Sequence, residues 1–221
     1  MPDGNQTTER RLRVLSWNVL RRCGATPGEV AAWVHAEAVD LVLLQEADDT
    51  FRSLSALLGG EYQGRAFDGG PDGLGAWSRA GLQDVRWLDL EMPDNGPKMR
   101  RKRRAMVITA NGTKVANVHL SHGQMLARRQ FAQAAGAIGE QGAVVGDYNM
   151  VGPVWVDGWM DAGPSTWTHL AKGLVPLRLD RCLVRGMQCD APRALRRGSS
   201  DHRPIVFDLI PIHHEHRTTA R

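Results

Sequence analysis

Short apolar runs recur along the chain, separated by polar and glycine-rich segments. The run Asp40–Glu46 is short and continuous, which is typical of a strand buried on both faces. Asn111 and Gly112 separate two other runs, and this dipeptide is the strongest short-range signal for a hairpin. Strands are therefore expected at residues 12–19, 40–46, 62–67, 75–79, 82–90, 105–110, 113–120, 143–147, 177–184, 187–195 and 203–210.

Helical patterns occupy the spaces between some of these strands. Thr26 is a good N-cap, because Pro27 follows at the first helical position and Glu29 lies three residues after the cap. Residues 150–176 are rich in Trp, Gly and Pro, and they predict loops with one helical turn. Helices are expected at residues 26–38, 50–58 and 126–138.

Strands and helices are mixed in both halves of the chain, and no sequence repeat is evident. This pattern favours one α/β domain of two packed sheets with helices outside. The domain is expected to cover residues 11–211, with polar tails at residues 1–10 and 212–221.

Composition narrows the class of protein. The chain has 221 residues, 42% of them apolar, and a net charge of +4 that suits an anionic partner. The chain has three cysteines, Cys23, Cys182 and Cys189, and their spacing matches no zinc motif. An odd number makes a disulfide framework unlikely, which favours a reducing compartment such as the cytoplasm. Residues 1–13 lack a signal-peptide pattern, and no apolar run approaches the roughly 20 residues of a membrane span.

Polar side chains stand at the ends of the predicted apolar strands. Four of them are carboxylates, and carboxylates at such positions are costly unless a cation or a donor neutralises them. Oxygen ligands without a cysteine suit Mg²⁺ or Mn²⁺ rather than Zn²⁺. Amides and imidazoles beside them would bind a phosphate oxyanion, which points to metal-assisted hydrolysis of a phosphate ester. The residues concerned are Asn18, Glu46, His119, Asp147, Asn149, Asp180, Asp201 and His202.

These residues stand in short motifs whose order along the chain is informative. The set resembles the ordered motifs of the endonuclease/exonuclease/phosphatase superfamily, which includes deoxyribonuclease I, exonuclease III-type endonucleases, neutral sphingomyelinases and inositol polyphosphate 5-phosphatases. The resemblance spans about residues 12–210 and implies a four-layer α/β sandwich of the deoxyribonuclease I type, with the site at one rim between two mixed sheets. The motifs are Ser16-Trp17-Asn18, Leu44-Gln45-Glu46, Asn117-Val118-His119-Leu120, Gly146-Asp147-Tyr148-Asn149, Arg178-Leu179-Asp180-Arg181 and Ser200-Asp201-His202-Arg203-Pro204.

The resemblance also implies a role for each motif residue. Glu46 is expected to be the main magnesium ligand, with Asn18 beside it and Asp201 as a further ligand. Asp147 is expected to position or deprotonate the attacking water, and Asn149 to hold that water or a phosphate oxygen.

The two motif histidines are expected to contact the phosphate. His202 would act as a base or charge stabiliser, with Asp180 accepting from its other ring nitrogen. His119 would bind a phosphate oxygen or assist the leaving group. The resemblance leaves open whether Asp147 or His202 is the base, and an acidic partner for His119 is sought at Asp89 or Glu91.

Simpler interpretations stand beside these roles. Asp180 could pair with Arg178 or Arg181, and Asn18 could be a turn residue. Glu46 could belong to a helix N-cap. His169 and Cys182 are expected to be ordinary satisfied or core residues, and the histidines of residues 213–216 to lie in a polar tail.

One dense basic run precedes the hairpin that carries His119. It is either a solvated loop or a contact for a phosphate backbone, formed by Arg100, Arg101, Lys102 and Arg103. Among the tryptophans, Trp155, Trp159 and Trp167 could stack on a base or meet a lipid surface, although core packing is the default.

Three functions remain open at this stage. The leading prediction is a Mg²⁺- or Mn²⁺-dependent phosphodiesterase, most plausibly a nuclease acting on DNA or RNA. The alternative within the same fold is a phospholipid or inositol-phosphate hydrolase. An inactive binding module is less favoured, because every acidic motif residue is present.

Overall fold

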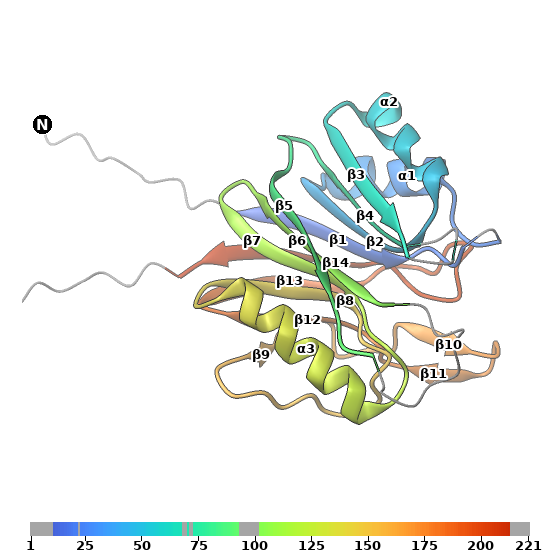
Figure 1. Ribbon diagram of the computed structural model, residues 1–221. Helices are drawn as coiled ribbons and strands as arrows, with labels where there is room; N and C mark the ends of the chain where they lie inside the picture. The colour runs from blue at the N-terminus through green and yellow to red at the C-terminus, as the bar shows by residue number, and fades with distance from the viewer. Residues whose placement is uncertain (1–10, 22, 68–69, 71–72, 93–101, 213–221) are drawn as a thin grey trace, which may run out of the picture.

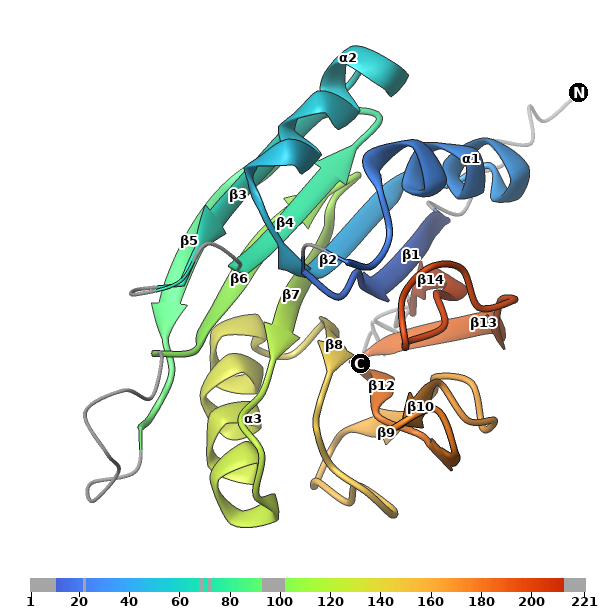
Figure 2. The same ribbon diagram turned by 90° about the vertical axis from the view of Figure 1, so that its right-hand side faces the viewer.

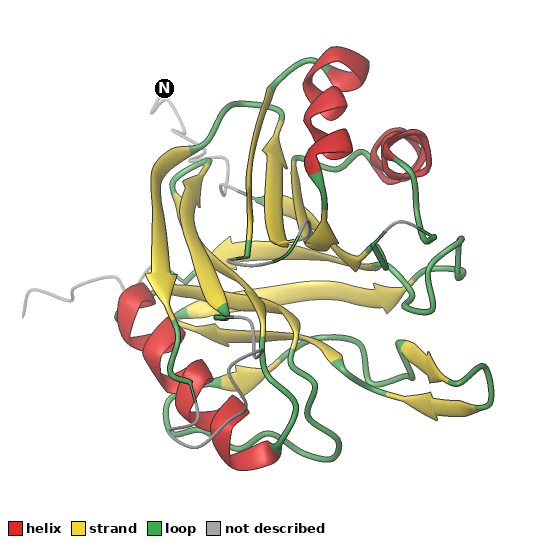
Figure 3. Ribbon diagram, turned by 45° about the vertical axis from the view of Figure 1, so that its right-hand side comes forward, coloured by secondary structure: helices red, strands yellow, loops and turns green. Residues whose placement is uncertain are grey.

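Two mixed six-stranded sheets pack face to face in the computed structural model, and helices cover their outer faces (Figures 1 and 3). The structure describes residues 11–21, 23–67, 70, 73–92 and 102–212. The layers run helices, sheet, sheet, helix, which confirms the predicted four-layer α/β sandwich. No helix in the described residues is long and apolar enough to cross a bilayer.

The first sheet, sheet A, joins the two ends of the described chain. Its strand order is β13-β14-β1-β2-β4-β3, with β1 parallel to β2 and the other neighbours antiparallel. The last strand therefore pairs directly with the first. The bounds are β1 Leu12–Asn18, β2 Leu41–Ala47, β3 Glu61–Ala66, β4 Gly73–Ser78, β13 Met187–Ala194 and β14 Ile205–Pro211.

The second sheet, sheet B, holds the middle of the chain in the order β5-β6-β7-β8-β12-β9. Its β6–β7 hairpin turns at Asn111 and Gly112, whose φ angles of 48° and 75° fit the predicted two-residue turn. The bounds are β5 Gln83–Asp89, β6 Arg104–Ala110, β7 Thr113–His119, β8 Gly142–Asp147, β9 Met160–Asp161 and β12 Asp180–Arg185. A separate small hairpin pairs β10 His169–Ala171 with β11 Val175–Leu177.

Two of the three predicted helices are present in the structure, and the third differs. Helix α1 (Pro27–Glu37) begins with the predicted capping box, and α3 (Gln124–Ile138) covers sheet B. The helix expected at residues 50–58 is instead a 3₁₀ turn, η1 (Asp49–Ser53), followed by α2 (Leu54–Leu58). The Asp48 carboxylate accepts from the backbone N–H of Thr50, and such short-range side-chain bonds favour a tight first turn.

Residues 150–176 are mostly loops, as predicted, but they contain short strands and no helical turn among the described residues. The expected helical turn is therefore wrong. The reason is local pairing: β9 joins the edge of sheet B, and β10 and β11 pair with each other. Strand pairing, rather than a helical turn, therefore holds this part of the chain in place.

Three apolar clusters hold the layers together. The first fills the space between the sheets with side chains such as Leu43, Met106 and Val145. The second lies between sheet B and α3, and the third between sheet A and the α1–α2 layer. Cys182 belongs to the first cluster, as expected of a core residue.

A buried amide pair joins the two sheets. The side-chain N–H of Gln45 in β2 donates to the Asn117 side-chain oxygen in β7 at 2.7 Å. The Asn117 amide donates in turn to the carbonyls of Leu44 and Gly75, both at 3.0 Å. Both side chains are fully buried, so these bonds fix how sheet B sits on sheet A.

We expect Asn117→Ala to lower the free energy of unfolding by about 3 kcal/mol, because it leaves several buried polar groups of sheet A unpaired. Urea unfolding followed by circular dichroism measures the change. Gln83→Ala, at an exposed strand position, is the control and should cost no more than about 0.5 kcal/mol. Equal effects of the two changes would show that the amide pair does not hold the sheets together.

Candidate active site

Asp147 ends β8 and stands at the centre of the rim of sheet B. In the strand register its Cα lies opposite His119 of β7 on one side and Asp180 of β12 on the other. Gly146 precedes it with φ 139°, and a Cβ there would lie 2.0 Å from the Val118 carbonyl oxygen. A glycine is therefore required for β8 to lie this close to β7, which is what brings Asp147 beside His119.

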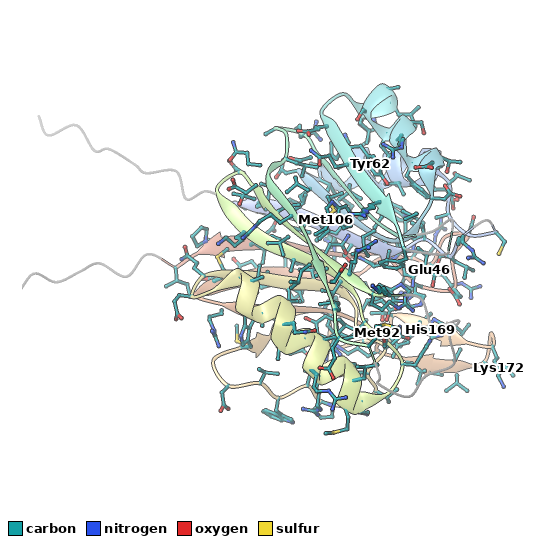
Figure 4. All side chains as sticks on the ribbon, viewed as in Figure 1. Glu46, Tyr62, Met92, Met106, His169 and Lys172 are labelled. Carbon is teal, nitrogen blue, oxygen red and sulfur yellow. The ribbon has the colours of Figure 1, made fainter. Side chains whose placement is uncertain are left out.

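Sheet A brings Asn18 and Glu46 to the same rim, from the ends of β1 and β2. Glu46 is the extra residue of a β-bulge between Gln45 and Ala47, and its φ is +57°. The bulge turns the Glu46 side chain out of the strand ladder at some cost in backbone energy. Figure 4 labels Glu46 at this end of the sheets, and Figure 2 faces it.

His202 lies in the loop just before β14 and is held by sheet A. The Trp17 indole N–H donates to its carbonyl at 3.0 Å, and its own N–H donates to the Ser200 hydroxyl at 3.1 Å. That hydroxyl donates to the carbonyl of Asn18 at 2.7 Å. Two bonds thus tie this loop to the end of β1, the third holds the loop together, and His202 is 5% exposed.

Nitrogen atoms from three elements converge on one oxygen, Oδ2 of Asp147. The Asn18 amide nitrogen lies 3.1 Å away and donates to it. Nε2 of His119 is at 3.5 Å, and Nε2 of His202 is at 3.8 Å. These contacts place sheet A, sheet B and the loop before β14 in one site.

The Asn18 amide also lies between two carboxylates. Its nitrogen donates to Glu46 Oε1 at 3.3 Å as well as to Asp147, while its oxygen accepts from the Leu20 N–H at 3.1 Å. Asn18 therefore makes the turn contact of the simpler interpretation and a site contact together. It presents a donor, rather than its oxygen, to the acidic pair.

Asp180 holds His202 rather than a neighbouring arginine. Oδ2 of Asp180 lies 2.8 Å from Nδ1 of His202, whereas Arg178 and Arg181 both pair with Asp161. Burial lowers the pKa of His202, but the charges of Asp180 and Asp147 outweigh burial and raise it to about 10. The imidazolium is therefore the stable form near neutral pH.

The raised pKa has a consequence for stability. Below its unfolded value, near 6.5, the charged His202 contributes its full stabilisation. The contribution is lost as pH rises from there through about 10. The two carboxyl groups beside His202 shift in opposite directions. Burial raises the pKa of Asp180. Burial also acts to raise the pKa of Asp147, but His202 and His119 outweigh it and lower that pKa.

His119 is a neutral imidazole. Burial first, and then the Arg103 guanidinium, lower its pKa to about 3. Arg103 can only donate, so Nδ1 of His119 at 3.0 Å accepts and the ring proton sits on Nε2, facing Asp147. The partner expected at Asp89 or Glu91 is wrong, since these carboxylates pair with Arg104 and Arg129.

Asn149 follows Asp147 by two residues in a left-handed conformation, with φ 49°. Its backbone N–H donates to Asp147 Oδ1 at 2.9 Å, and its side-chain amide donates to the Leu120 carbonyl at 3.0 Å. Asn tolerates this conformation better than most residues. The first bond holds the Asn149 backbone against the carboxylate, and the second fixes the direction of its side chain.

Two groups of predicted residues are placed differently. Among the described contacts, Asp201 faces His169, at 3.8 Å, rather than Glu46. Arg100 and Arg101 lie outside the described residues, and Lys102 is exposed. Arg103 contacts His119 and also lies over the Phe67 ring at 5.4 Å, so the basic run leads straight into the site.

Sequence reasoning missed Arg103 as the partner of His119, and it treated His169 as an ordinary residue. Nδ1 of His169 is buried without a hydrogen-bond partner among the described residues, and its ring lies 4.3 Å from that of His202. No spacing in the sequence indicates either contact, because both join segments that meet only in the folded chain.

Comparison with known proteins identifies the family. The sequence model of the Endonuclease/Exonuclease/phosphatase family matches residues 15–202, which is most of the chain. The chain belongs to this family. Its fold is the one that deoxyribonuclease I-like members of the superfamily share, and members of this family generally hydrolyse phosphate esters. No curated protein sequence matches.

Solved structures agree on the fold of this family member. A family protein from Bacteroides thetaiotaomicron has a TM-score of 0.72 at 17% identity, covering 93% of this chain and 98% of that one. A conserved protein of unknown function from Enterococcus faecalis scores 0.71 at 17% identity, with 90% and 99% covered. Truncated TDP2 from Caenorhabditis elegans scores 0.64 at 18% identity, with 90% and 97% covered.

We expect Asp180→Asn to lower the pKa of His202 from about 10 by at least one unit, because the carboxylate with the largest effect of the three that raise this pKa is removed. An NMR titration of the His202 imidazole measures the change. Asp157→Asn, at an exposed position, is the matched control and should leave that pKa in place. An unchanged pKa of His202 in the Asp180→Asn variant would show that Asp180 does not raise it.

Proposed function

We propose that this family member is a divalent-metal-dependent phosphodiesterase that cleaves nucleic acid. The observation that carries the proposal is the convergence of Asn18, His119 and His202 on one oxygen of Asp147. A buried carboxylate with three nitrogen neighbours is costly to build for stability alone, and the chain belongs to a family that generally hydrolyses phosphate esters.

The acidic groups at the rim fit a hard cation. Glu46 and Asp147 share a single amide donor, so their mutual repulsion is only partly offset. Oxygen donors of this kind suit Mg²⁺ or Mn²⁺, and we propose Glu46 as the main ligand, with Asn18 beside it. The ion, when bound, would polarise a phosphoryl oxygen and help to neutralise the charge that develops on it.

Asp147 is the group that would accept a proton from the attacking water. It is ionised near neutral pH, because its pKa is lowered by His202 and His119 despite burial. Its Oδ1 already accepts the Asn149 N–H, which fixes the carboxylate plane. The Asn149 amide stands beside it, where it can hold the water or a phosphate oxygen.

The two histidines would hold the phosphate as donors. His202 carries a positive charge that Asp180 stabilises and orients, so it can offset charge on the phosphorane oxygens. His119 presents its Nε2 proton, because Arg103 occupies Nδ1. In this arrangement the base is Asp147, and the histidines supply the oxyanion contacts.

Two features favour nucleic acid over other phosphate esters. The basic run reaches the site through Arg103, and Arg100, Arg101 and Lys102 are proposed to contact the phosphate backbone. Trp167 is 37% exposed and lies under Arg203 at 4.6 Å, next to the Thr168 that supports Asp180, so it could stack on a base.

The same proposal includes a cellular setting. Cys23, Cys182 and Cys189 are free thiols in the structure, and free thiols persist in a reducing compartment. We therefore propose that the enzyme works in the cytoplasm.

A metal-dependent screen tests the function. Plasmid, single strands, abasic duplex, RNA, phospholipid vesicles and inositol phosphates are each incubated with Mg²⁺ or Mn²⁺, and His202→Ala serves as the control for contaminating nuclease. We expect cleavage of at least one nucleic acid, lost in the variant. Release of head groups alone would replace the nuclease proposal with the lipid or inositol-phosphate alternative. No hydrolysis of any ester would favour a binding module.

We expect Glu46→Gln to raise the Mg²⁺ concentration needed for half-maximal activity at least about tenfold, because a charged ligand becomes neutral. Its melting temperature should stay close to that of the parent protein, since Glu46 is only partly buried. The matched control is Glu140→Gln at an exposed position. An unchanged metal requirement in the Glu46 variant would remove Glu46 from the metal site.

A further inference from the structure

Three side chains form a second compact group at the rim, on the side of the small β10–β11 hairpin. One ligand atom each from His169, Asp201 and His202 lies within 4.8 Å of the others. Nδ1 of His169 is 3.8 Å from Oδ2 of Asp201, and the two imidazole rings lie 4.3 Å apart. Figure 4 labels His169 at the same end of the molecule as Glu46.

Backbone bonds hold this group in place. His169 and His202 form a β-bridge between β10 and the loop before β14. The N–H of Leu170 donates to the Asp201 carbonyl at 3.1 Å, and the N–H of Arg203 donates to the Thr168 carbonyl at 2.6 Å. The positions of the three side chains are therefore set by regular backbone pairing and not by a free loop.

The group contains polar atoms that lack partners. Nδ1 of His169 and Oδ1 of Asp201 are both buried and accept no hydrogen bond from the described residues. Leaving such atoms unpaired costs about 1–3 kcal/mol each. Oδ1 of Asp201 lacks a proton donor or a cation, and Nδ1 of His169 has a lone pair for a cation in the tautomer that is protonated on Nε2.

His202, the third residue of the group, is also oriented to bind a cation. Asp180 accepts the Nδ1 proton of His202, which leaves Nε2 as the free ring nitrogen. A carboxylate on one imidazole nitrogen with a metal on the other is a common arrangement at zinc sites, where the carboxylate fixes the ring and raises its basicity.

We propose that His169, Asp201 and His202 bind a zinc ion. Two imidazoles and one carboxylate are the donor set of many three-ligand zinc sites, and they differ from the oxygen donors around Glu46. Zinc bonds of about 2.0–2.2 Å place tetrahedral ligands roughly 3.4 Å apart, so ligand atoms that now lie within 4.8 Å of one another would move closer by up to about 1.4 Å. The Asp201 side chain is 38% exposed, which leaves a path from solvent.

Zinc at this site would take over the Nε2 atom of His202. Zinc bound to Nε2 would displace into solvent any proton on that nitrogen. His202 would then have no donor left for a phosphate oxygen, so zinc should inhibit hydrolysis. This inhibition rests on the proposed function, whereas zinc binding does not.

Zinc affinity is measured directly by competition with a chromophoric chelator. The full chain also carries His213, His214 and His216, which could bind zinc by themselves, so each measurement is repeated with these three changed to Ala. In that background we expect one zinc ion per chain, with the affinity reduced at least tenfold by His169→Gln and by Asp201→Asn. His35→Gln on α1, at an exposed position, is the matched control and should bind as the background does.

The outcomes separate the two proposals. NMR signals of the His169 and His202 imidazoles should shift on adding one equivalent of zinc. No binding in the tail-substituted background, or equal affinity in the His169 and Asp201 variants, would overturn the zinc site. Binding without inhibition of Mg²⁺-dependent hydrolysis would uphold the zinc site and count against the role given to His202.

Discussion

The site depends on how two separate sheets are aligned, and the buried pair of Gln45 and Asn117 provides that alignment. Each amide lies close to a site residue in its own strand. Gln45 directly precedes Glu46, and Asn117 lies two residues before His119. Apolar contacts between the sheets tolerate sliding far better than directional hydrogen bonds do. The amide pair therefore fixes the relative position of the two halves of the active site.

Charge balance at the rim follows from that alignment. The carboxylates of Glu46 and Asp147 come from different sheets and are separated by one amide, that of Asn18. Asp147 and Asp180 lie on either side of the positively charged His202. Asp147 and Asp180 thus share a neighbour of opposite charge, whereas Glu46 shares the Asn18 amide with Asp147.

The parts of the fold that local chemistry controls could be predicted from sequence. The capping box at Thr26 and the turn at Asn111 and Gly112 depend on residues close together in the chain, and both were expected. The ends of β7 and β8 could be predicted because each strand ends in a polar residue, His119 or Asp147, after an apolar run. The site residues were found by motif order in the same way.

The contacts that could not be predicted join distant segments. Arg103 belongs to a run of similar charges, and nothing in that run distinguishes the one residue that faces His119. His169 meets His202 only because a three-residue strand pairs with a loop, and strands this short leave almost no periodic signal. The position of Asp201 depends on the same pairing.

The insertion of β14 between β13 and β1 also governs when the active site can exist. Residues 205–209 pair with residues 12–16, so this part of sheet A closes only after nearly the whole described chain has left the ribosome. His202 stands directly before that strand and is anchored to β1. A nascent chain that already holds Glu46, His119 and Asp147 therefore lacks the cationic partner of its central carboxylate, and the candidate site is complete only after the final strand of sheet A has docked.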